Sequence, residues 1–200
     1  MKTSLGARTW AMPTPVWLIG TYDSDHRPNV MAVAWGGICC SKPPCVAVSL
    51  RKATYSYASL VARKAFTVSV PSARYVHEAD YCGIVSGRTI DKFATCGLTP
   101  VNSEVVDAPY VGEFPLVLEC QLLHTIELGL HTQFVGEIID VKADASVIGA
   151  DGNIDAALIQ PFTYDPSTRN YYGTGASLGK SFSIGKTWLG DRPPVVVSPK

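Results

Sequence analysis

The chain has 200 residues, and its 17 basic and 17 acidic side chains leave a formal net charge of zero. This balance gives no broad basic field for nucleic acid or for an anionic membrane surface, so we expect neither partner. No apolar run approaches the roughly 20 residues that span a bilayer, and no apolar segment of a secretory signal follows Lys2. Six scattered cysteines without a C-x-x-C spacing fit a reduced, cytoplasmic protein, and the length fits one domain over residues 1–200.

The chain begins with three predicted strands. The first covers Pro15–Tyr22, and turn-forming residues follow it over Asp23–Pro28. The other two strands, Asn29–Trp35 and Cys45–Leu50, are expected to pair through a turn marked by prolines.

The strand over Asn29–Trp35 has two different faces. Side chains alternate along a strand, so Ala32 and Ala34 share one face and the larger residues between them share the other. The larger face can pack on a core. The small face continues into the glycine pair 36–37, so a flat ligand could approach its main-chain groups. The alternative is a small-residue strand beneath a tightly packed core.

A helix is predicted over Thr54–Lys64, because apolar residues recur there at spacings of three and four. Thr54 suits the N-cap, and Arg51 and Lys52 lie just ahead of it. A helix start offers unpaired N–H groups at the positive end of the dipole, so these residues and Ser56 suit a phosphate. The alternative is an ordinary capped helix with a solvated basic end.

The later elements are mostly strands. In chain order we expect a strand over Phe66–Val70, a short helix over Val76–Cys82, a helix from a Thr89 cap to Cys96 that ends at Gly97, a loop over Pro100–Pro109, a strand hairpin of Leu116–Glu127 and His131–Val141 around Gly129, a turn at Asp151-Gly152, an irregular segment over Gly173–Gly185 and a tail over 190–200. Many strands with two or three short helices argue against a doubly wound α/β sheet. The chain is therefore predicted to be mainly β, with a closed or nearly closed antiparallel barrel.

Other catalytic motifs do not fit. The run GTGASLGKS has Thr174 where a P-loop requires glycine, and its G-x-G lacks the strand–helix unit of a dinucleotide site. No G-x-S-x-G elbow is present. Cys39, Cys40 and Cys45 lack a fourth ligand for zinc, so no metal site is predicted, and buried structural thiols are favoured over a redox role. The same interpretation applies to the other cysteines, at positions 82, 96 and 120.

Seven short motifs occur in a recognisable order. They are N-x-M-x-x-A-W from Asn29, S-x-P-P from Ser41, V-x-V-S-L-R-K from Val46, FTVSVP (66–71), DYCGIVSG (80–87), DKF (91–93) and HTQFVGE (131–137). With this set the chain resembles the flavoredoxin branch of the flavin reductase-like, FMN-binding split-barrel proteins over about residues 12–186. The resemblance implies a split barrel of roughly six antiparallel strands, usually a homodimer with FMN at the interface.

The resemblance also implies a set of FMN-binding residues. They are Asn29, Met31, Ala32, Val33, Ala34, Trp35, Ser49, Leu50, Arg51, Lys52, Thr54, Tyr55, Ser56, Ser86 and Lys92. Main-chain groups of Met31 to Trp35 would line the isoalloxazine edge. Arg51, Thr54 and Lys92 match the family's phosphate contacts best.

His131 is the one candidate for a catalytic role. Related flavin reductases carry G-D-H where this chain has Gly129-Leu130-His131, and their histidine lies by the nicotinamide, so the resemblance implies that His131 helps to position NADH or NADPH. A structural histidine is the alternative.

The expected function is an FMN oxidoreductase that moves electrons from NAD(P)H through FMN to a small-molecule or redox-protein acceptor. Leu130, in place of the aspartate, favours an alternative, a flavoredoxin-type electron carrier without direct NAD(P)H use. A further alternative is a split-barrel protein that binds another ligand, such as haem or a deazaflavin.

Overall fold

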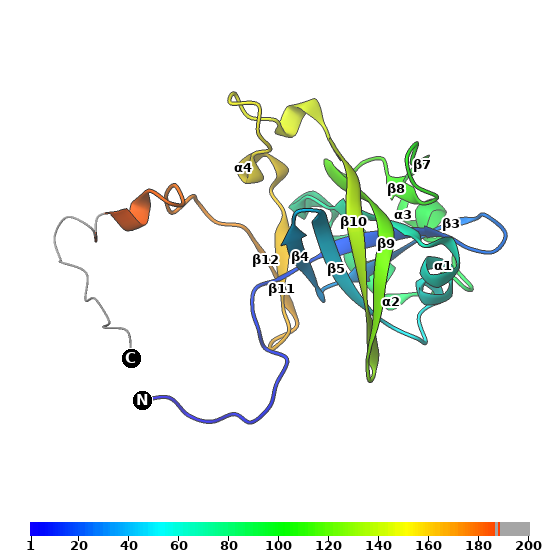
Figure 1. Cartoon of the computed structure of the whole chain (residues 1–200), viewed down its shortest axis with the longest axis horizontal. Helices are drawn as coiled ribbons and strands as arrows, with labels where there is room; N and C mark the ends of the chain where they lie inside the picture. Colours follow the sequence, from blue (N-terminus) through cyan, green and yellow to red (C-terminus); the bar gives the residue numbers. More distant parts are fainter. Residues whose placement is uncertain (187, 189–200) are drawn as a thin grey trace.

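The computed structural model describes residues 1–186 and 188, and a seven-stranded antiparallel sheet dominates it (Figure 1). The strand order is β3-β2-β6-β9-β10-β5-β4. The strands are β2 (Trp17–Tyr22), β3 (Pro28–Val33), β4 (Gly36–Ser41), β5 (Pro44–Arg51), β6 (Ala65–Val70), β9 (Leu116–Leu128) and β10 (His131–Ala143). The predicted hairpin around Gly129 is thus confirmed, because β9 and β10 pair along nearly their whole lengths.

Six of these strands close around one apolar core. Side chains from β2, β3, β5, β6, β9 and β10 share a single buried cluster, and Phe66 and Phe134 are its largest fully buried members. Beyond the end of β3, the Trp35 carbonyl accepts a hydrogen bond from the Ser49 N–H of β5 at 2.8 Å. This link closes the sheet into a barrel, as predicted, and leaves β4 as an outer strand beside β5.

The expected hairpin of Asn29–Trp35 with Cys45–Leu50 is wrong, although the two segments meet at the Ser49–Trp35 hydrogen bond. The first strand ends at Val33, and a separate strand, β4, forms the hairpin with β5. β4 starts in close contact with β2, since a Cβ atom at Gly36 would lie 2.7 Å from the Trp17 ring. Only a glycine fits at this position.

Short helices and two small sheets cover the barrel. They are α1 (Tyr55–Arg63), α2 (Val76–Ile84), α3 (Lys92–Cys96) and α4 (Ala156–Ile159), with β1 (Thr14–Pro15), β11 (Phe162–Asp165) and β12 (Asn170–Gly173) in one sheet and β7 (Pro100–Asn102) and β8 (Pro109–Val111) in the other. A second apolar cluster lies between α2, α3 and the outward-facing side chains of β2 and β3, including Leu18 and Val30. None of the described helices has the length and apolar character needed to cross a membrane.

Several predicted boundaries need correction. The predicted strand Pro15–Tyr22 is broken at Val16, and α3 starts at Lys92 with Asp91 as its cap, because the Asp91 carboxylate accepts the Ala94 N–H at 3.0 Å. The expected loop over Pro100–Pro109 contains β7. On α1 the buried residues are Ser56, Ser59 and Leu60, whereas Val61 is exposed. The predicted tail over 190–200 lies outside the described residues.

Candidate functional site

A cavity of about 220 Å³ lies between the start of α1, strand β3 and the segment that follows α2. It brings together six of the predicted residues: Met31, Thr54, Tyr55, Ser56, Ser86 and Lys92. The remaining lining comes from Ala53 and from residues 82–85 and 87. We call this space the anion cavity, because a lysine, Lys92, lies in its wall.

Lys92 is a buried cation in the wall of the anion cavity. Its side chain is only 4% exposed, and Nζ donates one hydrogen bond, to the Cys82 carbonyl at 2.8 Å. Burial lowers the pKa of Lys92, although the nearby Cys82 and Cys96 thiols oppose this shift. Within the described residues Lys92 forms no salt bridge. An ammonium group has three donors, so a phosphate in the cavity would supply the missing charge and acceptors.

Asn29, behind the lining, holds Ser56 and Gly87 in place. Asn29 Nδ2 donates to Ser56 Oγ at 2.8 Å, and both side chains are buried. Gly87 lies directly against Asn29: a Cβ atom at Gly87 would be 2.0 Å from Asn29 Oδ1 and 3.0 Å from Tyr55 Cδ1. This close approach connects the segment after α2 with the first turn of α1.

Gly87→Ala is expected to distort the wall of the anion cavity. The added methyl group must displace Asn29 or Tyr55, which we expect to cost about 1–2 kcal/mol of unfolding free energy. FMN binding should weaken together with stability, as measured by denaturant unfolding and flavin titration. Gly175→Ala is the control, because its Cβ atom would meet nothing within 4 Å and Gly175 is not among the residues lining the cavity. Equal behaviour of the two variants would contradict the role given to Gly87.

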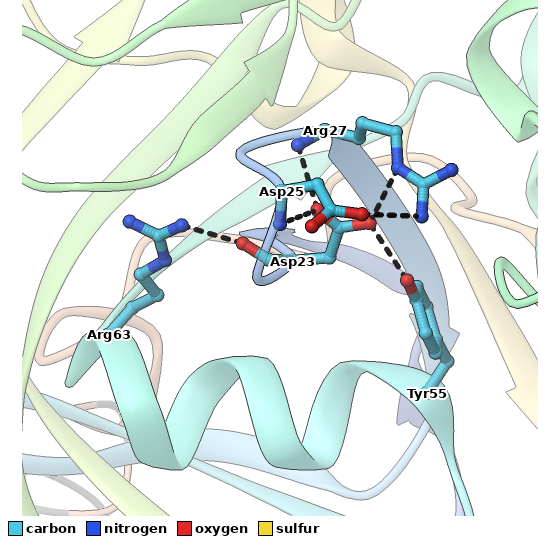
Figure 2. A network of polar contacts seen from close by, with 5 residues as sticks. All are labelled: Asp23, Asp25, Arg27, Tyr55 and Arg63. Carbon is cyan, nitrogen blue, oxygen red and sulfur yellow. Dashed lines mark hydrogen bonds and ion pairs between the residues drawn. The ribbon is translucent and has the colours of Figure 1, made fainter.

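A network around Asp23 positions Tyr55 beside the anion cavity (Figure 2). The Tyr55 hydroxyl donates to Asp23 Oδ2 at 2.8 Å, and Arg27 Nε donates to the same oxygen at 3.0 Å. Oδ1 accepts the Asp25 and Arg27 N–H groups, each at 2.9 Å. At the other end of α1, Arg63 donates to the Asp23 carbonyl at 2.6 Å. The turn between β2 and β3 is therefore bonded to both ends of α1.

The charge of Asp23 is maintained by these donors. The carboxylate is 5% exposed, and burial raises its pKa, but the hydrogen bonds from Arg27, Tyr55 and Asp25 outweigh burial and leave the pKa lowered. Sequence reasoning assigned Asp23 only to a turn. The donors that hold its carboxylate are Asp25, Arg27 and Tyr55. Only the first two are close to Asp23 in the sequence, so the contact with Tyr55 could not be seen there.

A second cavity, of about 440 Å³, adjoins the first. Gly83 and Ile84 line both cavities, and the second is also lined by Ala32, Val33 and Ala34. The small strand face therefore does border open space, in agreement with the prediction. We call this space the ring cavity.

The far wall of the ring cavity was not predicted. It comes from the β11–β12 hairpin, through Tyr164, Arg169 and Tyr171, and from Asp80 of α2. The Tyr171 hydroxyl donates to Asp80 Oδ1 at 2.7 Å, which fixes the hairpin against the helix. Burial and the Asp80 carboxylate raise the pKa of Tyr171, so this hydroxyl keeps its proton. Only the tertiary fold brings these distant segments together.

Some predicted residues have other contacts. Leu50 is 1% exposed and belongs to the barrel core, and Lys52 Nζ pairs with Glu127 Oε2 at 2.7 Å. The Arg51 carbonyl accepts the Thr54 N–H and the Thr54 hydroxyl, at 3.0 and 2.8 Å, so this hydroxyl does not cap α1. Arg51 and His131 are not among the described residues that line the two cavities. They lie opposite each other in the pairing of β5 with β10.

The remaining predicted residues lie at the barrel seam and on exposed surface. Ser49 and Trp35 form the hydrogen bond that closes the barrel. Cys45, Cys82 and Cys120 are buried as predicted, and burial, the largest cause, raises the pKa of Cys82 to about 12. The prediction is wrong for Cys39 and Cys40, which are exposed because they lie on the outer strand β4. Within the described residues no group of three side chains could hold a metal ion.

Comparison with known proteins agrees with this geometry. Residues 8–168 match the family model described as the flavin reductase like domain. The chain belongs to this family. A solved flavoredoxin of Desulfovibrio vulgaris (Miyazaki F) is 60% identical, with a TM-score of 0.89 over 93% of this chain and 100% of that one. The resemblance seen in the sequence and the split-barrel fold are thereby confirmed.

Two relatives match this chain over only part of their own length. An Archaeoglobus fulgidus protein is 31% identical over 116 residues, which cover 58% of this chain and 66% of that protein. The high molecular weight rubredoxin of Moorella thermoacetica is 31% identical over 154 residues, or 73% of this chain and 58% of that protein. The chain thus spans less than two thirds of the length of each of these relatives.

Proposed function

We propose that this protein binds FMN and uses it to transfer electrons. The observation that carries the proposal is the buried Lys92, which has no carboxylate partner in the described residues and lines a cavity that shares Gly83 and Ile84 with the cavity along the small-residue face of β3. An anionic group and a flat ring on one ligand match these two adjoining spaces. The 60% identity to a flavoredoxin supports the same assignment.

Each end of the ligand has its own residues. Lys92 would hold the phosphate, with Ser56, Ser86 and the main chain at the start of α1 as further donors. Main-chain groups of Met31 to Trp35 would lie along the ring edge. Ile84, which is 73% exposed where the cavities meet, would shield the ring from water. When bound, FMN supplies the hydride and single-electron chemistry, and the chain supplies binding and orientation.

NAD(P)H is proposed as the electron donor, with His131 as a residue that helps to position it. A second candidate is an electron carrier that does not use a nicotinamide directly. Two observations favour this second function: Leu130 is 65% exposed where related reductases carry aspartate, and one relative is named a rubredoxin. The proposed electron acceptor is a small molecule or a redox protein. We also propose a cytoplasmic location, which the six free thiols support.

Purified protein should bind FMN and quench its fluorescence on titration. Rapid bleaching of the bound flavin by NADH or NADPH without oxygen is the result expected of a reductase. A flavin that stays oxidised with both donors but is reduced by a redox protein, for example reduced rubredoxin, would select the carrier. Absence of FMN binding would overturn both functions.

We also propose a homodimer, formed through the β9–β10 hairpin. Six large apolar side chains on it are between 42% and 65% exposed, which is a large apolar area for a free surface. They are Leu123, Ile126, Leu128, Leu130, Ile139 and Val141. A second copy of the chain is the partner that the family resemblance implies.

Ile126→Glu is expected to shift this dimer toward monomer by at least tenfold in dissociation constant, because a buried unpaired charge costs well over about 1.4 kcal/mol. Light scattering after size-exclusion chromatography measures the change. Leu158→Glu is the control, since Leu158 is 49% exposed on α4, which is not part of the hairpin. A wild-type protein that is monomeric at micromolar concentration would contradict the proposal.

A further inference from the structure

The β4–β5 hairpin carries three thiols outside the cavities described above. β4 is the outer strand of the seven-stranded sheet (Figure 1), and Cys39 and Cys40 near its end are exposed. Cys45, at the start of β5, is only 4% exposed. An accessible thiol therefore lies a few residues from a buried one, across a tight turn.

The strand register brings Cys40 and Cys45 face to face. They are directly opposite partners in the antiparallel β4–β5 ladder. Opposite residues in such a ladder have Cα atoms about 4.5 or 5.5 Å apart, and both values fall within the range of about 4.4–6.8 Å found for disulfides. Side chains of opposite residues point to the same side of the sheet, so the two sulfur atoms share one face.

Cys39 does not share this position. The register shifts between Ile38 and Cys40, which marks a β-bulge, and Cys39 is the residue left out of the pairing. The Cys45 sulfur lies toward the turn, because its thiol donates to the Pro43 carbonyl at 3.4 Å. Burial is the largest cause of the raised pKa of Cys45, and the neighbouring Cys40 thiol raises this pKa further.

We propose that Cys40 and Cys45 form a reversible cross-strand disulfide, a redox site separate from the proposed flavin site. The oxidant is a small disulfide of the glutathione class. The exposed Cys40 thiolate attacks one sulfur of this molecule and releases one thiol, forming a mixed disulfide. The Cys45 thiolate then attacks the Cys40 sulfur and releases the second thiol. Two protein thiols lose two electrons and two protons, and the small disulfide gains them.

The roles of the two cysteines follow from their environments. Cys40 is accessible, so it meets the oxidant, whereas Cys45 is buried and lies directly opposite Cys40 in the ladder. Disulfides in reducing compartments are mostly transient and redox-sensing, which is the behaviour expected of a strained or exposed bond. The bond would join β4 covalently to β5 and lock the free edge of the sheet in response to oxidation.

The full chain, with and without FMN, is treated with oxidised glutathione and then alkylated under denaturing conditions. Wild-type protein should lose two alkylatable thiols, and its intact mass should fall by two hydrogen atoms. Mapping of the alkyl groups should leave only Cys40 and Cys45 unmodified, and dithiothreitol should restore both. The FMN-free sample keeps this result independent of the proposed flavin function.

Three variants test the assignment. Cys40→Ser should abolish the loss of two thiols, and Cys45→Ala, which keeps a small apolar side chain in the buried position, should leave glutathione attached to Cys40. Cys39→Ser is the matched control and should still form the disulfide. The proposal is overturned if wild-type protein keeps glutathione on Cys40 without closing the bond. It is equally overturned if Cys39→Ser prevents closure.

Discussion

Replacement of Lys92 by methionine is expected to weaken FMN binding by about 30- to 150-fold and to leave riboflavin binding unchanged. Methionine keeps an unbranched apolar stem of similar length, so the packing around the buried side chain is retained. It removes the ammonium group, whose charge-assisted hydrogen bonds to a phosphate are worth about 2–3 kcal/mol. Fluorescence titrations with both flavins measure the two affinities.

The control for this variant is Lys52→Met. Lys52 also precedes α1, but its ammonium group pairs with Glu127 and lines neither the anion cavity nor the ring cavity as far as these are described. We expect at most about a threefold loss of FMN affinity from it, the size of a surface ion-pair effect. A loss of FMN and riboflavin binding to the same extent in Lys92→Met would show that the lysine stabilises the cavity without contacting the phosphate.

The lowered pKa of Lys92 adds a pH signature. Between that pKa and the ordinary lysine value of 10.5, the unfolded chain holds more protons at this position than the folded chain, so the contribution of Lys92 to stability rises with pH. Buried thiols act in the opposite direction, because the raised pKa of Cys82 makes stability fall above the ordinary value of 9.0. Wild type and Lys92→Met both contain these thiols, but the Lys92 charge lowers the Cys82 pKa, so loss of that charge makes the stability of the variant fall further with pH. Their difference in unfolding free energy should therefore move in favour of wild type as the solution becomes more alkaline.

The parts of the fold that the sequence predicted have local signals. The β9–β10 hairpin is two long β-rich runs around Gly129, and α1 has a helical period and a polar start, so each could be found within its own segment. β11 and β12 lack such a signal, because these four-residue strands exist only by pairing with β1 and with each other. The separate strand β4 was missed because only Ala34 and Trp35 lie between it and β3, so the sequence predicts the two strands as one segment ahead of β5.

The candidate site divides in the same way. The residue types around the start of α1 and on the small face of β3 were predicted, and both surfaces do line cavities. Which cation reaches the anion cavity depends on tertiary position: Arg51 and Lys52 are nearer to α1 in sequence, but Lys92 is the one placed in the wall. The contribution of Asp23 was invisible for the same reason, since its Tyr55 and Arg63 donors come from α1, which follows three strands later.

Replacement of Asp23 by alanine is expected to lower the free energy of unfolding by about 3 kcal/mol. The change leaves the Tyr55 hydroxyl, the Arg27 guanidinium and two backbone N–H groups without their acceptor (Figure 2). Each lost hydrogen bond costs about 0.5–1.5 kcal/mol net, because donors such as the Arg27 guanidinium, which is 69% exposed, can bind water instead. For a chain of this size the melting temperature should fall by about 6–12 °C. Calorimetry measures the shift, and FMN binding should weaken with it because Tyr55 lines the anion cavity.

Asp25→Ala provides the matched control, because Asp25 pairs with the same Arg27 guanidinium at 3.5 Å but its side chain is 71% exposed. An exposed pair of this kind contributes about 0.2–1 kcal/mol, so its melting temperature should stay close to that of wild type. Similar losses in Asp23→Ala and Asp25→Ala would mean that the turn is held by its shape and not by the buried carboxylate.

Asp23→Asn separates charge from shape, because the amide is nearly the size of the carboxylate but cannot accept from all four donors. The folded-state pKa of Asp23 lies below the ordinary value of 3.8, so the charge contributes fully above 3.8 and its contribution is lost as the pH falls through the lowered value. The difference in unfolding free energy between wild type and Asp23→Asn should therefore be constant near neutral pH and shrink under strongly acidic conditions. Denaturant titrations across this range measure it. A difference that did not change with pH would mean that hydrogen-bond geometry, and not the negative charge, holds the turn to α1.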